Sequence, residues 1–147
     1  MKTWLLASAL WLTVLASVVP SLWLPDSHWM TFRRLYIHDA AAGAVPDVNM
    51  DVDFYRDFVV HWHSIVRQAK SNVGGDFIGV CETEGQAEVS PYRAFPAKID
   101  LDWWMNPKVC NLGVGSYYVE TEFSWSPLVG TRTIVVQSNP FKIFPPQ

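Results

Sequence analysis

The stretch from Lys98 to Phe144 decides the fold, and it reads K-I-D-L-D-W-W-M-N-P-K-V-C-N-L-G-V-G-S-Y-Y-V-E-T-E-F-S-W-S-P-L-V-G-T-R-T-I-V-V-Q-S-N-P-F-K-I-F. Between residues 115 and 124 apolar or β-branched side chains alternate with polar ones, which is the period of a strand with one wet face. A short connection at residues 126–130 follows, and residues 131–138 run back with Ile134, Val135 and Val136 at their centre. The stretch therefore predicts a β-hairpin.

Further strands are predicted on both sides of this hairpin. The clearest alternation in the chain is Val48, Met50, Val52 and Phe54 against polar residues at the positions between them. Other strand-like runs are residues 32–38, 58–67, 77–83, 98–104 and 141–144. About seven or eight short strands with no soluble helix predict an all-β fold, an antiparallel β-sandwich.

The composition bounds the number of domains and the kind of partner. The chain has 147 residues, a net charge of −3 and eight Trp, and only 17% of its residues are charged. Residues 31–147 suffice for one domain with its own core. We expect no nucleic-acid partner, because such a partner requires a basic face, and the motifs imply no cofactor.

The N-terminal segment predicts a membrane anchor at residues 1–30. Residues 3–24 carry no charge, and as a helix they would extend about 33 Å, enough to cross a bilayer. Trp4, Trp23 and Trp29 bracket this run, as interfacial aromatic residues do. We therefore expect a transmembrane helix that contacts the lipid bilayer through residues 3–24, with a cleaved signal peptide and a buried helix as the alternatives.

The two cysteines, Cys81 and Cys110, bear on the orientation of the anchor. Lys2 favours an N-terminus inside the cell, whereas Arg33 and Arg34 favour the reverse. In an exported domain the two cysteines would form a disulfide worth about 3–4 kcal/mol, and the alternative is a pair of buried thiols in the cytosol. Pairing predicts a single-pass protein of the inner (cytoplasmic) membrane, with its C-terminal domain in the periplasm or outside the cell.

A resemblance to a known class rests on the closing third of the chain. The G-x-Y at Gly115 to Tyr117, a short turn, and the run from Ser138 to Ile143 resemble the last two strands of extracellular immunoglobulin-like modules. The layout is similar to small bacteriophage, prophage or bacterial envelope proteins in which one membrane helix carries one immunoglobulin-like β-sandwich. In antibody-type domains the cysteines are more widely spaced and a tyrosine precedes the second one, which this sequence does not reproduce around Cys110.

His61 and His63 are the candidate metal ligands. In a strand these two positions share a face, so both imidazoles could bind one metal ion. A third ligand would have to come from elsewhere in the chain, from His38, His28 or a carboxylate such as Asp57 or Glu120. The alternative is an ordinary solvent-facing strand, and paired acids such as Glu120 with Glu122 are open to the same two interpretations.

Trp103, Trp104 and Trp125 form a candidate binding surface for a protein or a glycan. Adjacent residues of a strand point to opposite faces, so one of Trp103 and Trp104 should lie in the core and the other outside.

These observations favour a membrane-anchored, extracytoplasmic module with a binding or structural role, of phage or prophage type as the resemblance implies. Its open strand edges also make self-association possible. No nucleophile or phosphate-binding motif is present, so we do not expect an enzyme. Two alternatives remain open, a small envelope metal-binding protein or hydrolase that uses His61 and His63, and a phage lysis or host-membrane factor.

Overall fold

The computed structural model describes residues 8, 10–16, 24–69, 77–93, 96, 98–105, 108, 110–127 and 130–146. Residues 10–16 are helical, and the strands of the described residues follow from residue 30 onward. The elements are η1 (Asp26–His28), β1 (Met30–Ile37), β2 (Ala40–Ala41), β3 (Asp47–Phe54), β4 (Phe58–Ala69), β5 (Phe77–Val89), β6 (Lys98–Asp100), α2 (Leu101–Trp104), β7 (Gly115–Trp125), β8 (Arg132–Gln137) and β9 (Phe141–Phe144).

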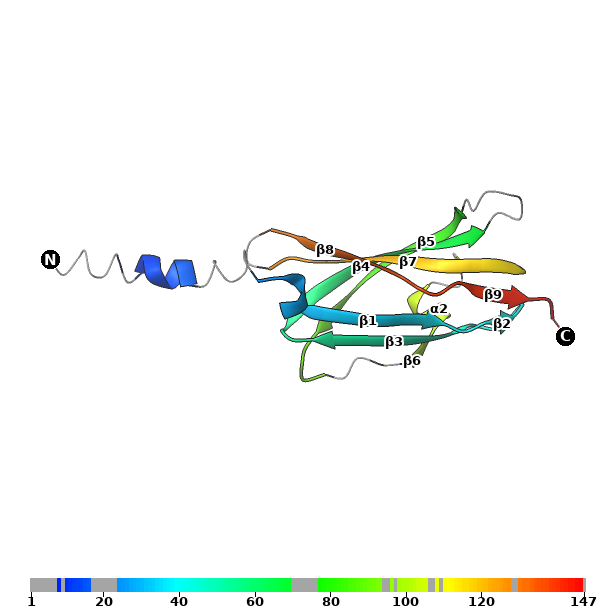
Figure 1. Ribbon diagram of the computed structural model, residues 1–147, viewed down its shortest axis with the longest axis horizontal. Helices are drawn as coiled ribbons and strands as arrows, with labels where there is room; N and C mark the ends of the chain where they lie inside the picture. Colours follow the sequence, from blue (N-terminus) through cyan, green and yellow to red (C-terminus); the bar gives the residue numbers. More distant parts are fainter. Residues whose placement is uncertain are drawn as a thin grey trace.

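Two sheets form the layers of a sandwich (Figure 1). The smaller sheet has three strands in the order β1-β3-β6, and the larger has six, β2-β9-β7-β4-β5 with β8 also paired to β7. β4 lies along one side of β7, while β8 and β9 follow one another along its other side. The larger sheet is therefore built around the central pair β4 and β7.

The alternating pattern of β7 explains how it covers the core. Tyr117, Val119, Thr121, Phe123 and Trp125 are all buried, and the residues between them face outward. The Tyr117 hydroxyl donates a hydrogen bond to the carbonyl oxygen of Gly113 at 2.7 Å, and burial raises the pKa of this phenol. One hydrophobic face thus closes the sandwich, as the period of two requires.

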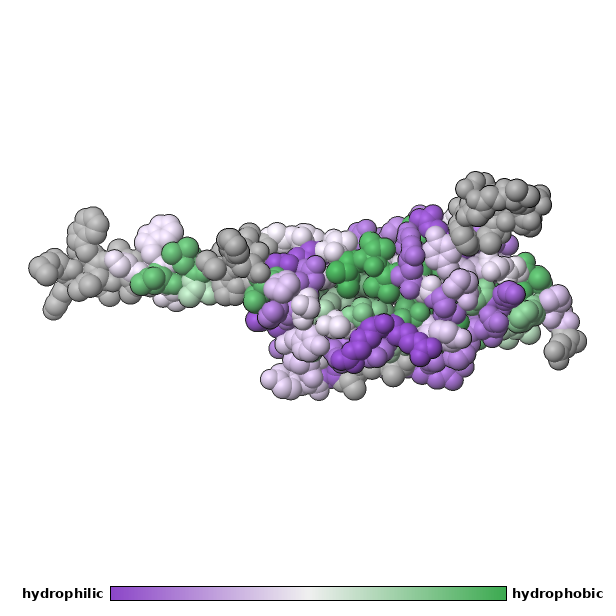
Figure 2. Space-filling model, viewed as in Figure 1, coloured by the Kyte–Doolittle hydropathy of each residue, from purple (hydrophilic) through white to green (hydrophobic). Residues whose placement is uncertain are grey.

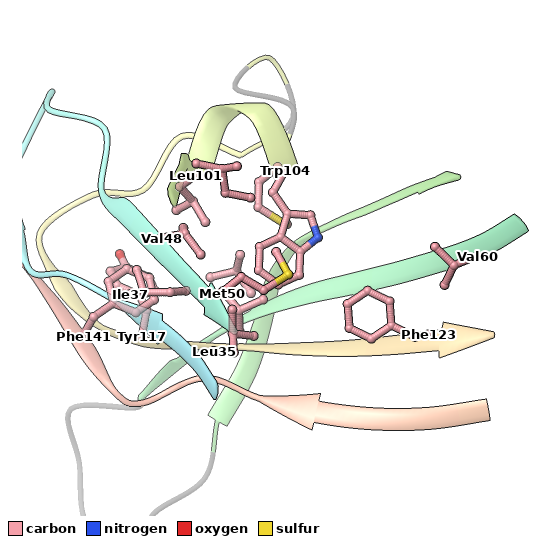
Figure 3. Close-up of a cluster of buried hydrophobic side chains, with 14 of the residues drawn as sticks. Leu35, Ile37, Val48, Met50, Val60, Leu101, Trp104, Tyr117, Phe123 and Phe141 are labelled. Atoms are coloured by element: carbon pink, nitrogen blue, oxygen red, sulfur yellow. The ribbon is translucent and has the colours of Figure 1, made fainter. Parts of the chain in front are cut away.

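The core lies between the sheets and receives side chains from both of them and from α2. Figure 3 shows its central members, which are Leu35, Ile37, Val48, Met50, Val60, Leu101, Trp104, Tyr117, Phe123 and Phe141. Removing this apolar surface from water is the main force that holds the layers together.

The first two strands of the chain belong to different sheets, so the chain passes from one layer to the other between them. β1 pairs with β3 in the smaller sheet, and β2 then pairs in parallel with β9 in the larger one. The Asn139 side chain accepts a hydrogen bond from the Ile37 N–H at 2.7 Å and donates one to the Ile37 carbonyl at 2.9 Å. The chain therefore holds its first and last strands together at the point of crossing.

The predicted transmembrane helix is wrong. Among the residues that the structure describes, none of the helices has the length and apolar character needed to cross a bilayer. Residues 3–7, 9 and 17–23 of the predicted span lie outside the described residues. The predicted single-pass location in the inner membrane rested on this helix and is wrong with it.

The predicted fold class needs further correction in its details. The chain is mostly β and its two sheets are sandwich-like, but nine strands are described and the β2–β9 pair is parallel. The sequence predicts one strand over residues 98–104. Instead β6 ends at Asp100, and α2 turns the next residues so that Leu101 and Trp104 both enter the core.

Candidate functional site

A hollow of about 670 Å³ lies at one end of the sandwich. We call it the loop-end pocket and define it by Trp29, Tyr55, Arg56, Asp57, His61 and Tyr92, which are among its lining residues. Three connections meet there, namely residues 55–57 between β3 and β4, residues 90–93 after β5, and residues 126–127 after β7.

The strand register explains why these connections meet. Phe58 at the start of β4 is opposite Val89 at the end of β5, and Val60 is opposite Trp125 at the end of β7. Met30 at the start of β1 is opposite Phe54 at the end of β3. Segments that are far apart in the sequence are therefore brought to one end of the sandwich.

Aromatic contacts fix the base of the loop-end pocket. The Trp29 ring lies edge-on to Phe58 with 6.0 Å between their centroids, and the Arg56 guanidinium lies over the Trp29 ring at 5.4 Å. The Tyr55 N–H donates to the Trp29 carbonyl at 2.9 Å. The Trp29 ring is thereby held between the core and a cationic side chain.

The rim of the loop-end pocket presents two tyrosines to solvent. Tyr92 is 91% exposed and Tyr55 is 47% exposed. The backbone N–H of Tyr92 donates to the Ser90 hydroxyl at 3.2 Å, which orders the turn that carries its ring. Exposed tyrosines on positioned connections are a common feature of protein recognition sites.

His61 and His63 share the outer face of β4, as expected for positions two apart. His63 is opposite Glu84 on β5 and Glu122 on β7, and its Nε2 lies 3.4 Å from an oxygen of Glu82. A second hollow of about 490 Å³ lies along this face, and His61 borders both hollows. Within the described ranges, no three His, Cys, Asp or Glu side chains are grouped so that they could hold a metal ion.

Trp103, Trp104 and Trp125 do not form one surface. Trp104 is only 4% exposed and Trp125 is also buried in the core, whereas Trp103 is 58% exposed. The Trp103 ring stacks on Trp62, with 6.5 Å between the centroids and 23° between the planes. Both neighbouring tryptophans belong to α2, which directs Trp104 into the core and leaves Trp103 exposed, so the three indoles do not lie on one surface.

Of the three tryptophans that the sequence predicts at a membrane interface, the structure describes only Trp29. Trp4 and Trp23 lie outside the described residues. Trp29 is half-buried at the base of the loop-end pocket and packs against the hydrophobic core. The Trp29 ring is therefore part of the packing of the folded domain.

Cys81 and Cys110 lie at disulfide distance and are bonded, with 5.4 Å between their Cα atoms. The bond ties β5 to the segment that leads into β7. Neither cysteine lines the loop-end pocket. The disulfide therefore joins parts of the β-sandwich and does not form part of the loop-end pocket.

Sequence reasoning missed Tyr55, Arg56 and Tyr92 as possible contact residues. The break in alternation at residues 55–57 and the turn at Pro91 mark them as connections. Their meeting at one end depends on strand order, which a single sequence does not reveal.

Comparison of the chain with known proteins adds no family to this description, because no protein-family model and no curated protein matches it.

Proposed function

We propose that this chain is a protein-binding module of immunoglobulin-like type that recognises its partner through the loop-end pocket. The strand order supports the first part of this proposal. In immunoglobulin domains the first, second and fifth strands share one sheet, and the third, sixth and seventh share the other, which variable-type domains extend at one edge. β1, β3 and β6 correspond to the first set, and β4, β7 and β8 with the added strand β5 correspond to the second.

Tyr117 gives independent support for the same class. Immunoglobulin-like domains carry a tyrosine near the start of the sixth strand whose hydroxyl bonds to the backbone a few residues upstream, two residues before a core cysteine. Tyr117 has this geometry through its bond to Gly113, and Val119 occupies the core position two residues later. This geometry supports the resemblance carried by Gly115 to Tyr117, although an apolar residue stands at the cysteine position.

The observation that carries the binding role is the composition of the loop-end pocket. Its rim and base combine two exposed tyrosines, a tryptophan and an arginine with Asp57 and His61. Trp, Tyr and Arg are the residues that most often dominate the binding energy of protein interfaces. Tyrosine supplies a large contact area at a low cost in side-chain entropy.

A photo-crosslinking experiment tests the proposed function. The full chain is expressed in its native host with benzoylphenylalanine in place of Tyr92, which substitutes one exposed aromatic residue for another. The matched control carries the same group at Phe144, which is exposed on β9. We expect discrete protein adducts from position 92 that are absent from position 144.

Specific adducts from position 92 should also decrease strongly when Arg56→Glu is added, because Arg56 belongs to the same pocket. Equal labelling from positions 92 and 144, or adducts indifferent to Arg56→Glu, would refute the proposed function. Adducts that consist only of glycan would replace the protein partner with a carbohydrate.

A further inference from the structure

The edges of the two sheets differ in how they are protected against pairing with another strand. Unpaired edges invite a further strand, and proteins block them with charges, bulges or very short strands. β1 carries Arg33 and Arg34 and a register shift between Phe32 and Arg34. β6 has three residues, two of them charged, and β2 has only two residues.

β5 and β8 are the edges of the larger sheet with enough length to accept a strand. β5 carries exposed Glu82, Glu84 and Glu88 on one face, so it is protected by charge. β8 carries no charged residue from Thr133 to Gln137. Among the described residues β8 pairs with β7 alone, because β2 covers β9 and ends there.

β8 also presents an apolar surface. Val135 is 59% exposed, and Ile134 and Val136 are only partly buried against the core. Figure 2 shows a hydrophobic patch over the middle of the molecule where Figure 1 places β8. Among the described edges, β8 therefore combines length, neutrality and exposed β-branched side chains.

We propose that β8 is a self-association edge that pairs in antiparallel fashion with β8 of a second copy of this chain. A two-fold axis perpendicular to the sheet would keep the outer faces of both copies on the same side. Directly opposed side chains in an antiparallel pair point to the same face. Outward residues must therefore oppose outward residues, which restricts the possible registers.

One register matches the chemistry of β8 along its whole length. With Val135 on the axis, Val135 is opposite Val135 of the second copy, and Ile134 is opposite Val136. Thr133 is then opposite Gln137, and Arg132 is opposite the neutral Ser138. Apolar residues meet apolar residues, polar residues meet polar ones, and no like charges are opposed. The same operation centred on Thr83, the middle residue of β5, would oppose Glu82 to Glu84.

Arg33, at the edge of the smaller sheet, does not repel the second copy by its charge. Arg33 forms ion pairs with Asp51 and Asp53 on β3, so this edge carries both signs of charge. A contact through one six-residue strand is small, and interfaces of that size are weak and reversible. We therefore expect a concentration-dependent dimer.

Cysteine crosslinking of the full chain tests the register. Val135→Cys should form a disulfide-linked dimer under mild oxidation, because the two positions face each other across the axis. Thr133→Cys is the matched control, since it is exposed on the same face of the same strand. Its two copies would lie four residues apart along the strands, about 14 Å, which is too far for a disulfide. Mass analysis verifies that the Cys81–Cys110 bond remains intact in both variants.

A second variant measures the association itself by sedimentation velocity over a concentration series. Val135→Lys should weaken the dimer about tenfold or more, because it places two like charges opposite each other in the contact. Val80→Lys on the β5 edge should leave the dimer unchanged. Equal crosslinking at positions 133 and 135, no crosslinking at position 135, or a dimer insensitive to Val135→Lys would each overturn the proposal. None of these readouts depends on the partner of the loop-end pocket.

Discussion

The hydroxyl groups of Ser64 on β4 and Thr121 on β7 are hydrogen-bonded to each other at 2.8 Å, and both residues are fully buried. They are direct cross-strand neighbours in the central pair of the larger sheet. Two polar groups therefore lie within the hydrophobic layer, and each satisfies the other.

Removing one hydroxyl of this pair should cost more than removing both. Ser64→Ala or Thr121→Val leaves the other hydroxyl buried without its partner, which costs about 1–3 kcal/mol of unfolding free energy. We therefore expect the double variant to be more stable than the worse single variant. Denaturant unfolding of the four proteins in a double-mutant cycle measures this. Ser124→Ala on the outer face is the control, and additive losses in the cycle would contradict the expectation.

Glu120 should make stability depend on pH in the acid range. A hydrogen bond from Gln137 and a second from Arg67 hold the pKa of this carboxyl below its ordinary value of 4.5. Because the folded pKa is the lower one, the stabilisation is fully present above the unfolded value and is lost as pH falls through the folded pKa. Glu120→Gln should lower stability at neutral pH and flatten the loss on acidification.

The matched control for this pH series is Glu122→Gln, which changes an exposed glutamate on the same face of β7. Unfolding midpoints measured from neutral to acid pH should separate the two variants. If Glu120→Gln has the same acid profile as the unmodified chain, the ion pair with Arg67 does not contribute as described.

The Cys81–Cys110 bond should contribute about 3–4 kcal/mol to stability, because it restricts the unfolded chain over a separation of 29 residues. Cys81→Ala combined with Cys110→Ala should lose this amount in denaturant unfolding under non-reducing conditions. The unmodified chain treated with a reductant should lose a similar amount, and the double variant should not respond to the reductant. A double variant as stable as the unmodified protein would contradict the prediction.

Gly85 should be required for the stacking of Trp62 on Trp103. A Cβ atom at Gly85 would overlap the Trp62 indole, so Gly85→Ala should displace this ring. We expect a changed near-ultraviolet circular dichroism spectrum and a loss of about 1–3 kcal/mol of stability. Gly113→Ala is the control, since an added Cβ there would have no atom within 4 Å. Identical spectra for both variants would show that the indole adapts freely.

Local periodicity predicted the strands that have one wet face. The alternation at residues 48–54 corresponds to β3, and residues 115–124 and 131–138 correspond to β7 and β8. In each case the alternation in the sequence identifies the face that packs against the core.

Other features depend on tertiary packing, which the alternation of polar and apolar residues does not reveal. The expectation that one of Trp103 and Trp104 is buried and the other exposed is met, yet a helical turn produces it. The apolar run at residues 3–24 predicted a transmembrane helix from hydropathy alone, and the described residues contain no helix long and apolar enough to cross a membrane. The loop-end pocket depends on strand order, which single-sequence patterns leave open.

The passage of the chain from β1 in one sheet to β2 in the other has a mechanical consequence. β2 and β9 run parallel, and Ala42, Asn139 and Lys142 take part in the additional hydrogen bonds that join the two ends of the domain. A pull applied before β2 and after β9 would load these bonds together in shear rather than break them one at a time. The domain should therefore resist tension between its ends far better than tension applied across β4 and β5, where the strands can unzip.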